Sequence, residues 1–98
     1  MNIAKNQNQN ELELKLTGRL DTTTAPELEN ELKESLGGIS MLILDFAELE
    51  YISSAGLRVI LSAQKAMNKQ GKMIVRNVNS EVNEVFEITG FSDILTIE

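Results

Sequence analysis

The sequence contains no histidine, no cysteine and no tryptophan. Without histidine and cysteine, the chain lacks the usual ligands of zinc and iron–sulfur sites, the thiolate nucleophile, and the base of a Ser-His-Asp triad. Most hydrolytic chemistry is lost with these residues, and we expect no metal and no cofactor. The lack of cysteine also excludes disulfides, which fits a reducing cytoplasm better than a small secreted scaffold.

Basic residues are scarce, because 9 Lys and Arg stand against 15 Asp and Glu and give a net charge of −6. This sign is wrong for tracking a phosphate backbone or an anionic membrane, so we expect no direct nucleic-acid partner and no membrane contact. Long apolar runs are missing too: the run 41–44 stops at Asp45, far short of the roughly 20 residues of a membrane span. The N-terminus has no basic region followed by an apolar stretch. These features predict a soluble, cytoplasmic protein.

What is present is an ordinary globular composition, with 42% hydrophobic and 24% charged residues in a chain of 98 residues. A chain of this length forms one domain, which we place at residues 1–98. It has room for a modest core but not for a large internal cavity. Any functional site is therefore expected on the surface.

Hydrophobic periodicity predicts that strands and helices alternate. Residues 11–17 alternate polar and apolar side chains, as in a strand with one covered face, whereas the continuous apolar run 41–46 is typical of a central strand. The tract Asn-Gln-Asn-Gln-Asn at 6–10 predicts a hairpin turn. The predicted strands cover residues 2–5, 11–17, 41–46, 72–75 and 94–97.

Three helices are predicted between and after these strands. The first begins at Thr24, whose side chain is expected to form a capping box with Glu27. The second has Ser54 as its simplest N-cap, and the third is capped by Asn79 or Ser80. The order of elements predicts an α/β fold with a mixed four- to five-stranded sheet and three main helices.

Two strand-to-helix connections carry unusual side chains: residues 18–24, and residues 48–57, which include most of a predicted loop at 47–53. Such connections are where α/β sheets usually build their sites. In the second, Ser53 and Ser54 place hydroxyl groups beside a helix N-terminus whose first amide groups lack partners. Gly56 is unfavourable in a first helical turn, which indicates close approach of a neighbouring backbone or of a partner.

Several segments carry a resemblance to a known family. Residues 42–46 read Leu-Ile-Leu-Asp-Phe, followed by Leu49, Tyr51-Ile52 and, over 53–57, Ser-Ser-Ala-Gly-Leu. Residues 17–21 read Thr-Gly-Arg-Leu-Asp, and Gly90-Phe91 follow downstream. Together these segments, which span nearly the whole chain, resemble the bacterial anti-sigma factor antagonists of the STAS domain family. The resemblance implies a single STAS-like domain.

The resemblance also implies a regulatory, partner-switching function and not an enzyme. In that family the unphosphorylated antagonist binds an anti-sigma factor that is also a serine kinase, and the sigma factor is thereby released. The kinase phosphorylates one serine at the start of the second helix, and a metal-dependent serine phosphatase reverses the modification. The implied partners are therefore an anti-sigma factor kinase and a serine phosphatase.

Alignment on Gly56 makes Ser54 the implied phosphorylation site, with Ser53 as the second choice. The implied partner-binding residues are Asp21, Thr22, Ser53, Ser54, Ala55, Gly56 and Arg58. This chain departs from the commonest family pattern at Ser53, where Asp is frequent, and at Ala55, where Ser or Thr is common. It also ends at Glu98, so we expect the family's C-terminal helix to be absent.

Two other functions stay open on the sequence. One is a STAS subunit that docks on a transporter or signalling complex without being phosphorylated. The other is a small nucleotide-binding enzyme that uses Ser54 and Asp21, which the absence of any base near Ser54 disfavours. Local alternatives also remain: Asp21 either ties down a turn or contacts a partner. Asp45 is expected to be structural, and Arg58 and Val59 to point outward.

Overall fold

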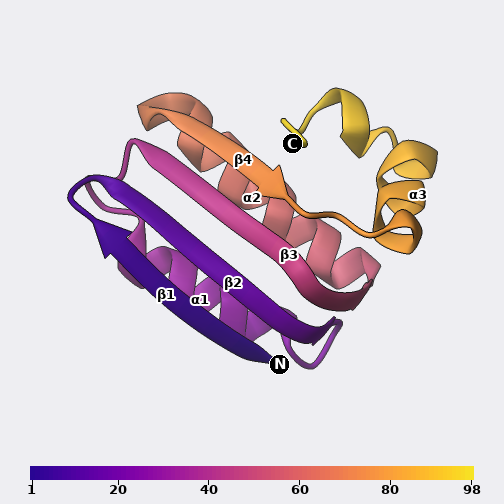
Figure 1. Cartoon of the computed structure of the whole chain (residues 1–98). Helices are drawn as coiled ribbons and strands as arrows, with labels where there is room; N and C mark the ends of the chain where they lie inside the picture. Colours follow the sequence, from indigo (N-terminus) through magenta and orange to yellow (C-terminus); the bar gives the residue numbers. More distant parts are fainter.

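Strands and helices alternate along the chain (Figure 1), and the computed structural model describes all 98 residues. The strands are β1 (Asn2–Asn8), β2 (Glu11–Leu20), β3 (Met41–Ile52) and β4 (Lys72–Arg76). The helices are α1 (Ala25–Ser35), α2 (Ser54–Gln70) and α3 (Ser80–Thr89), followed by a 3-10 turn at Phe91–Asp93. None of these helices combines the length and the apolar character that crossing a bilayer requires.

The four strands form one mixed sheet in the order β1-β2-β3-β4. β1 pairs antiparallel with β2, whereas β2, β3 and β4 run parallel. Parallel neighbours need a crossover connection, which α1 and α2 provide. These two helices contact each other and lie on the same face of the sheet, while α3 lies beyond the end of β4 (Figure 1). The predicted α/β fold with a mixed sheet and three main helices is confirmed.

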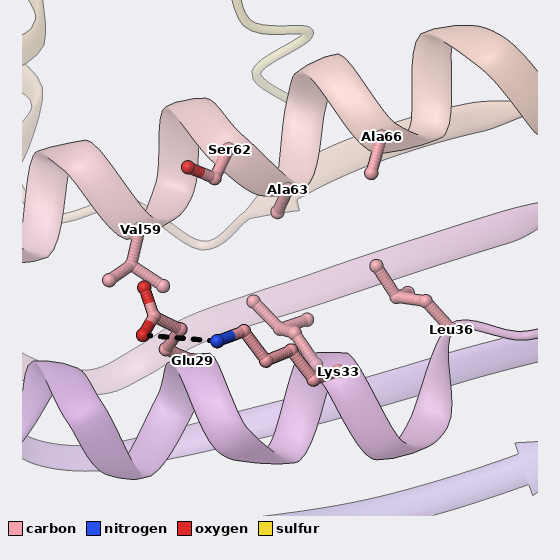
Figure 2. Close-up of a pocket in the computed structure, with 8 residues that line it drawn as sticks. Glu29, Lys33, Leu36, Val59, Ser62, Ala63 and Ala66 are labelled. Atoms are coloured by element: carbon pink, nitrogen blue, oxygen red, sulfur yellow. Dashed lines mark ion pairs between the residues drawn. The ribbon is translucent and has the colours of Figure 1, made fainter.

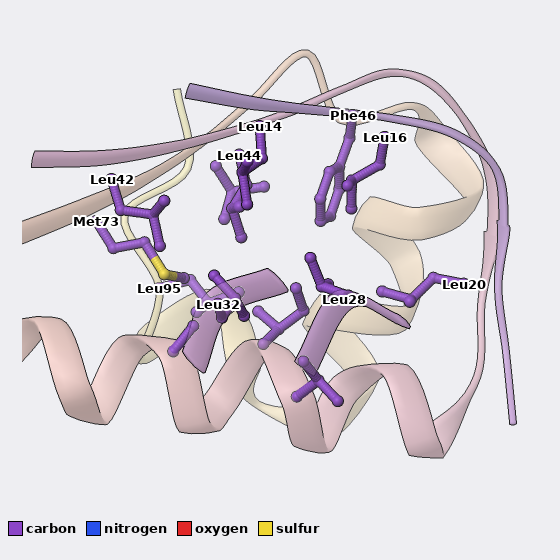
Figure 3. Close-up of a cluster of buried hydrophobic side chains, with 14 of the residues drawn as sticks. Leu14, Leu16, Leu20, Leu28, Leu32, Leu42, Leu44, Phe46, Met73 and Leu95 are labelled. Carbon is purple, nitrogen blue, oxygen red and sulfur yellow. The ribbon is translucent and has the colours of Figure 1, made fainter. Parts of the chain in front are cut away.

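The core fills the space between the sheet and the helices (Figure 3). The alternation in β2 turns Leu12, Leu14 and Leu16 toward the helices, and all three side chains are fully buried. Each such leucine contributes about 1.5–3 kcal/mol relative to an exposed one, which is enough to fix the register of the strand. Other fully buried side chains that share this core are Leu20, Leu28, Leu42, Leu44, Phe46, Leu49, Ile60 and Phe86.

The N-terminal hairpin has a shorter turn than the polar tract predicts. β1 continues to Asn8, which pairs with Glu11 of β2, so the turn is confined to Gln9 and Asn10. Gln9 adopts the left-handed conformation that a tight turn needs, with a φ of 56°. The prediction of a turn over 6–10 was wrong because an exposed edge strand tolerates polar side chains, so their presence did not end the pairing.

The sheet also differs from prediction at two other places. β3 runs to Ile52, so most of the predicted loop 47–53 is strand, and this extension pairs with the end of β2 after two register shifts. The shifts break the periodicity by which a strand is recognised. The predicted strand 94–97 is reduced to a single bridge between Ile97 and Val75.

Gly71 follows α2 where the chain passes against the backbone of Ser40, and a Cβ added at Gly71 would overlap the Ser40 carbonyl oxygen. We expect Gly71→Ala to lower the free energy of unfolding by about 1–3 kcal/mol, because one backbone segment must move. The matched control is Gly37→Ala, whose Cβ meets no atom within 4 Å and should leave stability nearly unchanged. Urea unfolding measures both, and equal midpoints would contradict the expectation.

Asp45 ties the end of β4 to β3. Its Oδ1 accepts hydrogen bonds from the Ala47 amide at 2.9 Å and from Asn77 Nδ2 at 3.0 Å. Partial burial raises the pKa of Asp45, but the bonds from Asn77 and Ala47, with the charges of Lys15 and Arg76, outweigh burial and lower the pKa below 3.8. This geometry agrees with the structural role that was expected for Asp45.

The lowered pKa of Asp45 makes stability depend on pH. Because the folded pKa lies below the unfolded one, the stabilisation is present above the unfolded pKa and is lost as the pH falls through the folded pKa. When the pH is lowered from about 7 to about 3, the free energy of unfolding should fall less in Asp45→Asn than in the wild type. Chemical unfolding at both pH values tests this, and identical pH dependence of the two proteins would refute it.

Candidate functional site

The carboxyl ends of β2 and β3 bring the two predicted site loops together. Leu20 at the end of β2 pairs with Ile52 at the end of β3, and the Ser53 amide donates to the Leu20 carbonyl oxygen at 2.9 Å. The turn that leads into α1 therefore lies beside the first turn of α2. Because parallel strands end at the same edge of a sheet, this proximity follows from the topology.

The two register shifts between β2 and β3 lie close to this edge. They place Arg19 opposite Tyr51, and the Arg19 guanidinium carbon lies 4.3 Å from the centre of the Tyr51 ring. Although Tyr51 makes this cation–π contact, the residue is still 41% exposed and lies beside the start of α2. The sequence does not reveal this pair, because the two residues lie opposite each other only through the irregular register.

Asp21 organises the turn before α1. Its Oδ1 accepts from the amides of Thr23 at 3.0 Å and Thr24 at 3.1 Å. The Thr24 amide bond is the main cause that lowers the pKa of Asp21, with further support from Thr23, the Thr24 hydroxyl and Arg19 against the opposing effect of burial. Asp21 therefore ties down the turn and remains ionised, while its side chain is still only half-buried.

The predicted capping box of α1 does not form. Thr24 is the N-cap by position, but its side chain makes no capping bond. Its hydroxyl donates instead to the Arg19 carbonyl oxygen at 2.7 Å and accepts from the Asp21 amide at 2.9 Å. The prediction was wrong because the tight turn before the helix offers Thr24 nearer partners than the helical amides do.

The cap of α2 is Ser53 and not Ser54. Ser53 has an extended backbone, with φ −99° and ψ 176°, and its Oγ accepts from the Gly56 amide at 3.4 Å. Ser54 is the first residue inside the helix, is exposed, and has no side-chain hydrogen bond. The prediction that Ser54 caps the helix is corrected, because the cap must be the last residue with non-helical geometry. The Ser54 hydroxyl is thus left free at the positive end of α2.

Gly56 lets the first turn of α2 approach the end of β2. A Cβ at this position would lie 2.7 Å from the Leu20 Cγ and 3.0 Å from the Leu20 carbonyl oxygen. The close backbone approach inferred from the sequence is therefore present, and the neighbour is the protein's own β2.

A shallow hollow of about 210 Å³ separates the start of α1 from the start of α2. It brings together three of the predicted partner-binding residues, Thr22, Ala55 and Arg58. Arg58 is exposed, as expected, and makes no ion pair, but Val59 is 6% exposed and packs inward, so the expectation for Val59 was wrong. Val59 faces α1, which the sequence does not reveal.

A neighbouring groove runs between α1 and α2, with a volume of about 330 Å³ (Figure 2). Its lining is mainly apolar, and an ion pair of 3.6 Å between Lys33 and Glu29 lies at its rim. None of the predicted site residues lines this groove. The candidate site is therefore the surface formed by the turn 21–24 and the first turn of α2.

Comparison with known proteins identifies the family. The model of the STAS domain matches residues 2–98. The BtrV protein of Bordetella bronchiseptica, named as a candidate anti-sigma factor antagonist, is 39% identical over 84 residues, which cover 84% of this chain and 72% of BtrV. The anti-sigma-B factor antagonist of Listeria monocytogenes is 31% identical over 104 residues, which cover this whole chain and 90% of that protein.

The solved structures agree with the fold. The anti-sigma factor antagonist SpoIIAA of Bacillus superimposes with a TM-score of 0.79 in its unphosphorylated form and 0.78 in its phosphorylated form, at 17% identity. Each comparison covers 99% of this chain, and 87% and 91% of the respective SpoIIAA chains. Fold, family match and relatives agree, and the chain therefore belongs to the STAS domain family, in the group of regulatory, non-enzymatic proteins represented by bacterial anti-sigma factor antagonists.

Proposed function

We propose that this protein is an anti-sigma factor antagonist that acts in the cytoplasm by partner switching. Its unphosphorylated form binds an anti-sigma factor that is also a serine kinase, and the sigma factor is released. Phosphorylation of Ser54 by that kinase ends the binding, and a serine phosphatase restores it. The family and the named relatives support the general function, and the geometry at the start of α2 supports the switch.

The observation that carries the proposal is the different use of two adjacent serines. The Ser53 hydroxyl is engaged by the Gly56 amide as the helix cap, whereas the Ser54 hydroxyl is exposed and has no partner. A phosphoryl group can therefore be added to Ser54 without breaking a bond of the fold. At a helix N-terminus the added charge of about −1.5 to −2 is favoured by about 0.3–1 kcal/mol.

Because the fold tolerates the phosphate, its effect falls on the complex. A partner surface that fits a small hydroxyl would have to desolvate a dianion, and the ionised Asp21 lies on the adjoining turn. Reversing a preference from mostly bound to mostly free takes about 5.5 kcal/mol. The free-energy cost of burying an unpaired dianion is large enough to supply this difference.

The proposed docking surface includes residues of both loops, and Thr22, Ala55 and Arg58 line one hollow. Its members are the predicted residues Asp21, Thr22, Ser53, Ser54, Ala55, Gly56 and Arg58. Gly56 and Ser53 contribute by shaping the helix start, whereas the exposed Thr22, Ser54 and Arg58 are available for contact. Two further carboxylates near this edge, Glu48 and Glu50 of β3, line a separate hollow with Gly18 and Asn79, so they lie outside the proposed surface.

Substitution of Ser54 tests the switch. We expect Ser54→Asp to weaken binding to the cognate kinase by about tenfold or more, equivalent to ~1.4 kcal/mol, whereas Ser54→Ala binds like the wild type. The matched control is Ser80→Asp, because Ser80 is likewise the exposed first residue of a helix, after the cap Asn79. Isothermal titration calorimetry measures the affinities of the wild type and of the three variants. Equal affinity of Ser54→Asp and the wild type would reject the proposed switch.

Phosphate mapping tests the choice between the two serines. After incubation with the kinase and ATP, mass spectrometry should locate phosphate on Ser54. Ser53→Ala should lose about 1 kcal/mol of stability with the helix cap but still be phosphorylated. Phosphate on Ser53 alone would refute the assigned site, and no phosphate on either serine would refute regulation by this modification.

A further inference from the structure

Arg58 is a cation without an anionic partner in a chain that is rich in carboxylates. Its side chain is exposed and forms no ion pair, although the chain contains 15 Asp and Glu. The other two arginines are both engaged: Arg19 pairs with Asp21 at 3.8 Å, and Arg76 pairs with Glu98 at 2.9 Å. Arg58 is therefore the only arginine whose charge the fold does not use.

The sequence of α2 explains why Arg58 has no partner on its own helix. α2 contains three basic residues and no acidic residue. Side chains three or four residues apart on a helix are neighbours, and those of Arg58 are Ser54, Ala55, Leu61 and Ser62. None of these four carries a charge in the unmodified protein. Among them, Ser54 is the residue that the proposed phosphorylation makes anionic.

The elements that face the start of α2 do not supply a partner for Arg58 either. One carboxylate, that of Glu29 on α1, lines the same hollow as Arg58. Glu29 pairs instead with Lys33 at 3.6 Å (Figure 2). Asp21, on the turn before α1, accepts from two backbone amides and pairs with Arg19. The guanidinium of Arg58 is therefore available for a new partner.

A phosphate on Ser54 lies within reach of this guanidinium. Ser54 and Arg58 are both exposed, so both lie on the solvent-facing side of α2. At a separation of four residues their Cβ atoms are about 6 Å apart, which the long arginine side chain spans. The order is also the favoured one, with the anion on the N-terminal side of the cation. Arginine binds phosphate oxygens through two parallel hydrogen bonds, which makes such a pair stronger than one with lysine.

We propose that Arg58 is the internal counter-ion of phosphorylated Ser54. This inference rests on the proposed function, because it takes Ser54 as the modified residue. Arg58 is the only cation among the residues of the proposed docking surface, so its pairing with the phosphate removes that cation from the surface. Phosphorylation then changes the docking surface twice: it adds a dianion, and it withdraws the cation that the unmodified protein offers to an acidic group of the partner.

The ion pair is tested without the kinase. Phosphoserine is incorporated at position 54 of the full chain during translation, and phosphorus NMR follows the loss of its second proton. Because Arg58 stabilises the dianion, the acid dissociation constant of the phosphate should be about twofold higher with Arg58 than in Arg58→Gln. The matched control is Lys65→Gln, which removes an exposed cation from α2 about 16 Å beyond Ser54 and should leave the constant unchanged.

A second signal reports the contact itself. The chain has three arginines, so their side-chain Nε–H signals can each be assigned by substitution. The signal of Arg58 should shift when position 54 carries phosphoserine. The inference is overturned if Arg58→Gln leaves the dissociation constant of the phosphate unchanged, or if Arg19→Gln lowers it in place of Arg58→Gln.

Affinity for the cognate kinase tests the withdrawal of the cation. Without phosphate, Arg58→Gln should bind about threefold more weakly than the wild type, whereas Lys65→Gln should bind like the wild type. Equal affinity of Arg58→Gln and the wild type would show that no binding cation is withdrawn and would overturn this part. If the kinase neither binds the wild type nor modifies Ser54, the proposed function fails, and the titration of the phosphoserine protein still decides on the ion pair.

Discussion

The contact on which the rest of the site depends is the one between the end of β2 and the start of α2. The Leu20 carbonyl oxygen accepts from the Ser53 amide, and Gly56 packs against Leu20 at a distance that excludes a Cβ. This contact joins two loops that are more than 30 residues apart in the sequence. With Leu20 fully buried in the core, the start of α2 is held on the rigid sheet and not on a mobile loop.

The rigid junction explains how one modification can control binding without disturbing the fold. Ser53 satisfies the helix, so the hydroxyl of Ser54 is not needed for stability. Ser53 thus stabilises the helix, and the neighbouring Ser54 is available for the proposed modification. Further along the same helix, Gln64 Oε1 is buried without a hydrogen-bond partner.

The elements with regular periodicity could be predicted, whereas the irregular ones could not. The leucines of β2 and the continuous apolar run of β3 are periodic or dense enough to identify a strand without knowledge of its neighbours. The extension of β3 to Ile52 passes through two register shifts, and its pairing is visible only against β2. The predicted hairpin turn was too long for a related reason: the backbone pairing of an edge strand does not require apolar side chains on β1.

The sequence by itself determined the α/β class, the family and the pair of serines at the start of α2, because composition, periodicity and a contiguous motif are local properties. Tertiary structure decided which serine is the cap, where the Thr24 hydroxyl bonds, and that Val59 is buried. It also decided that Arg19 meets Tyr51 and that Gln64 lacks a donor. Each of these depends on atoms contributed by other elements, and their positions follow from the packing of α1 and α2 on the sheet.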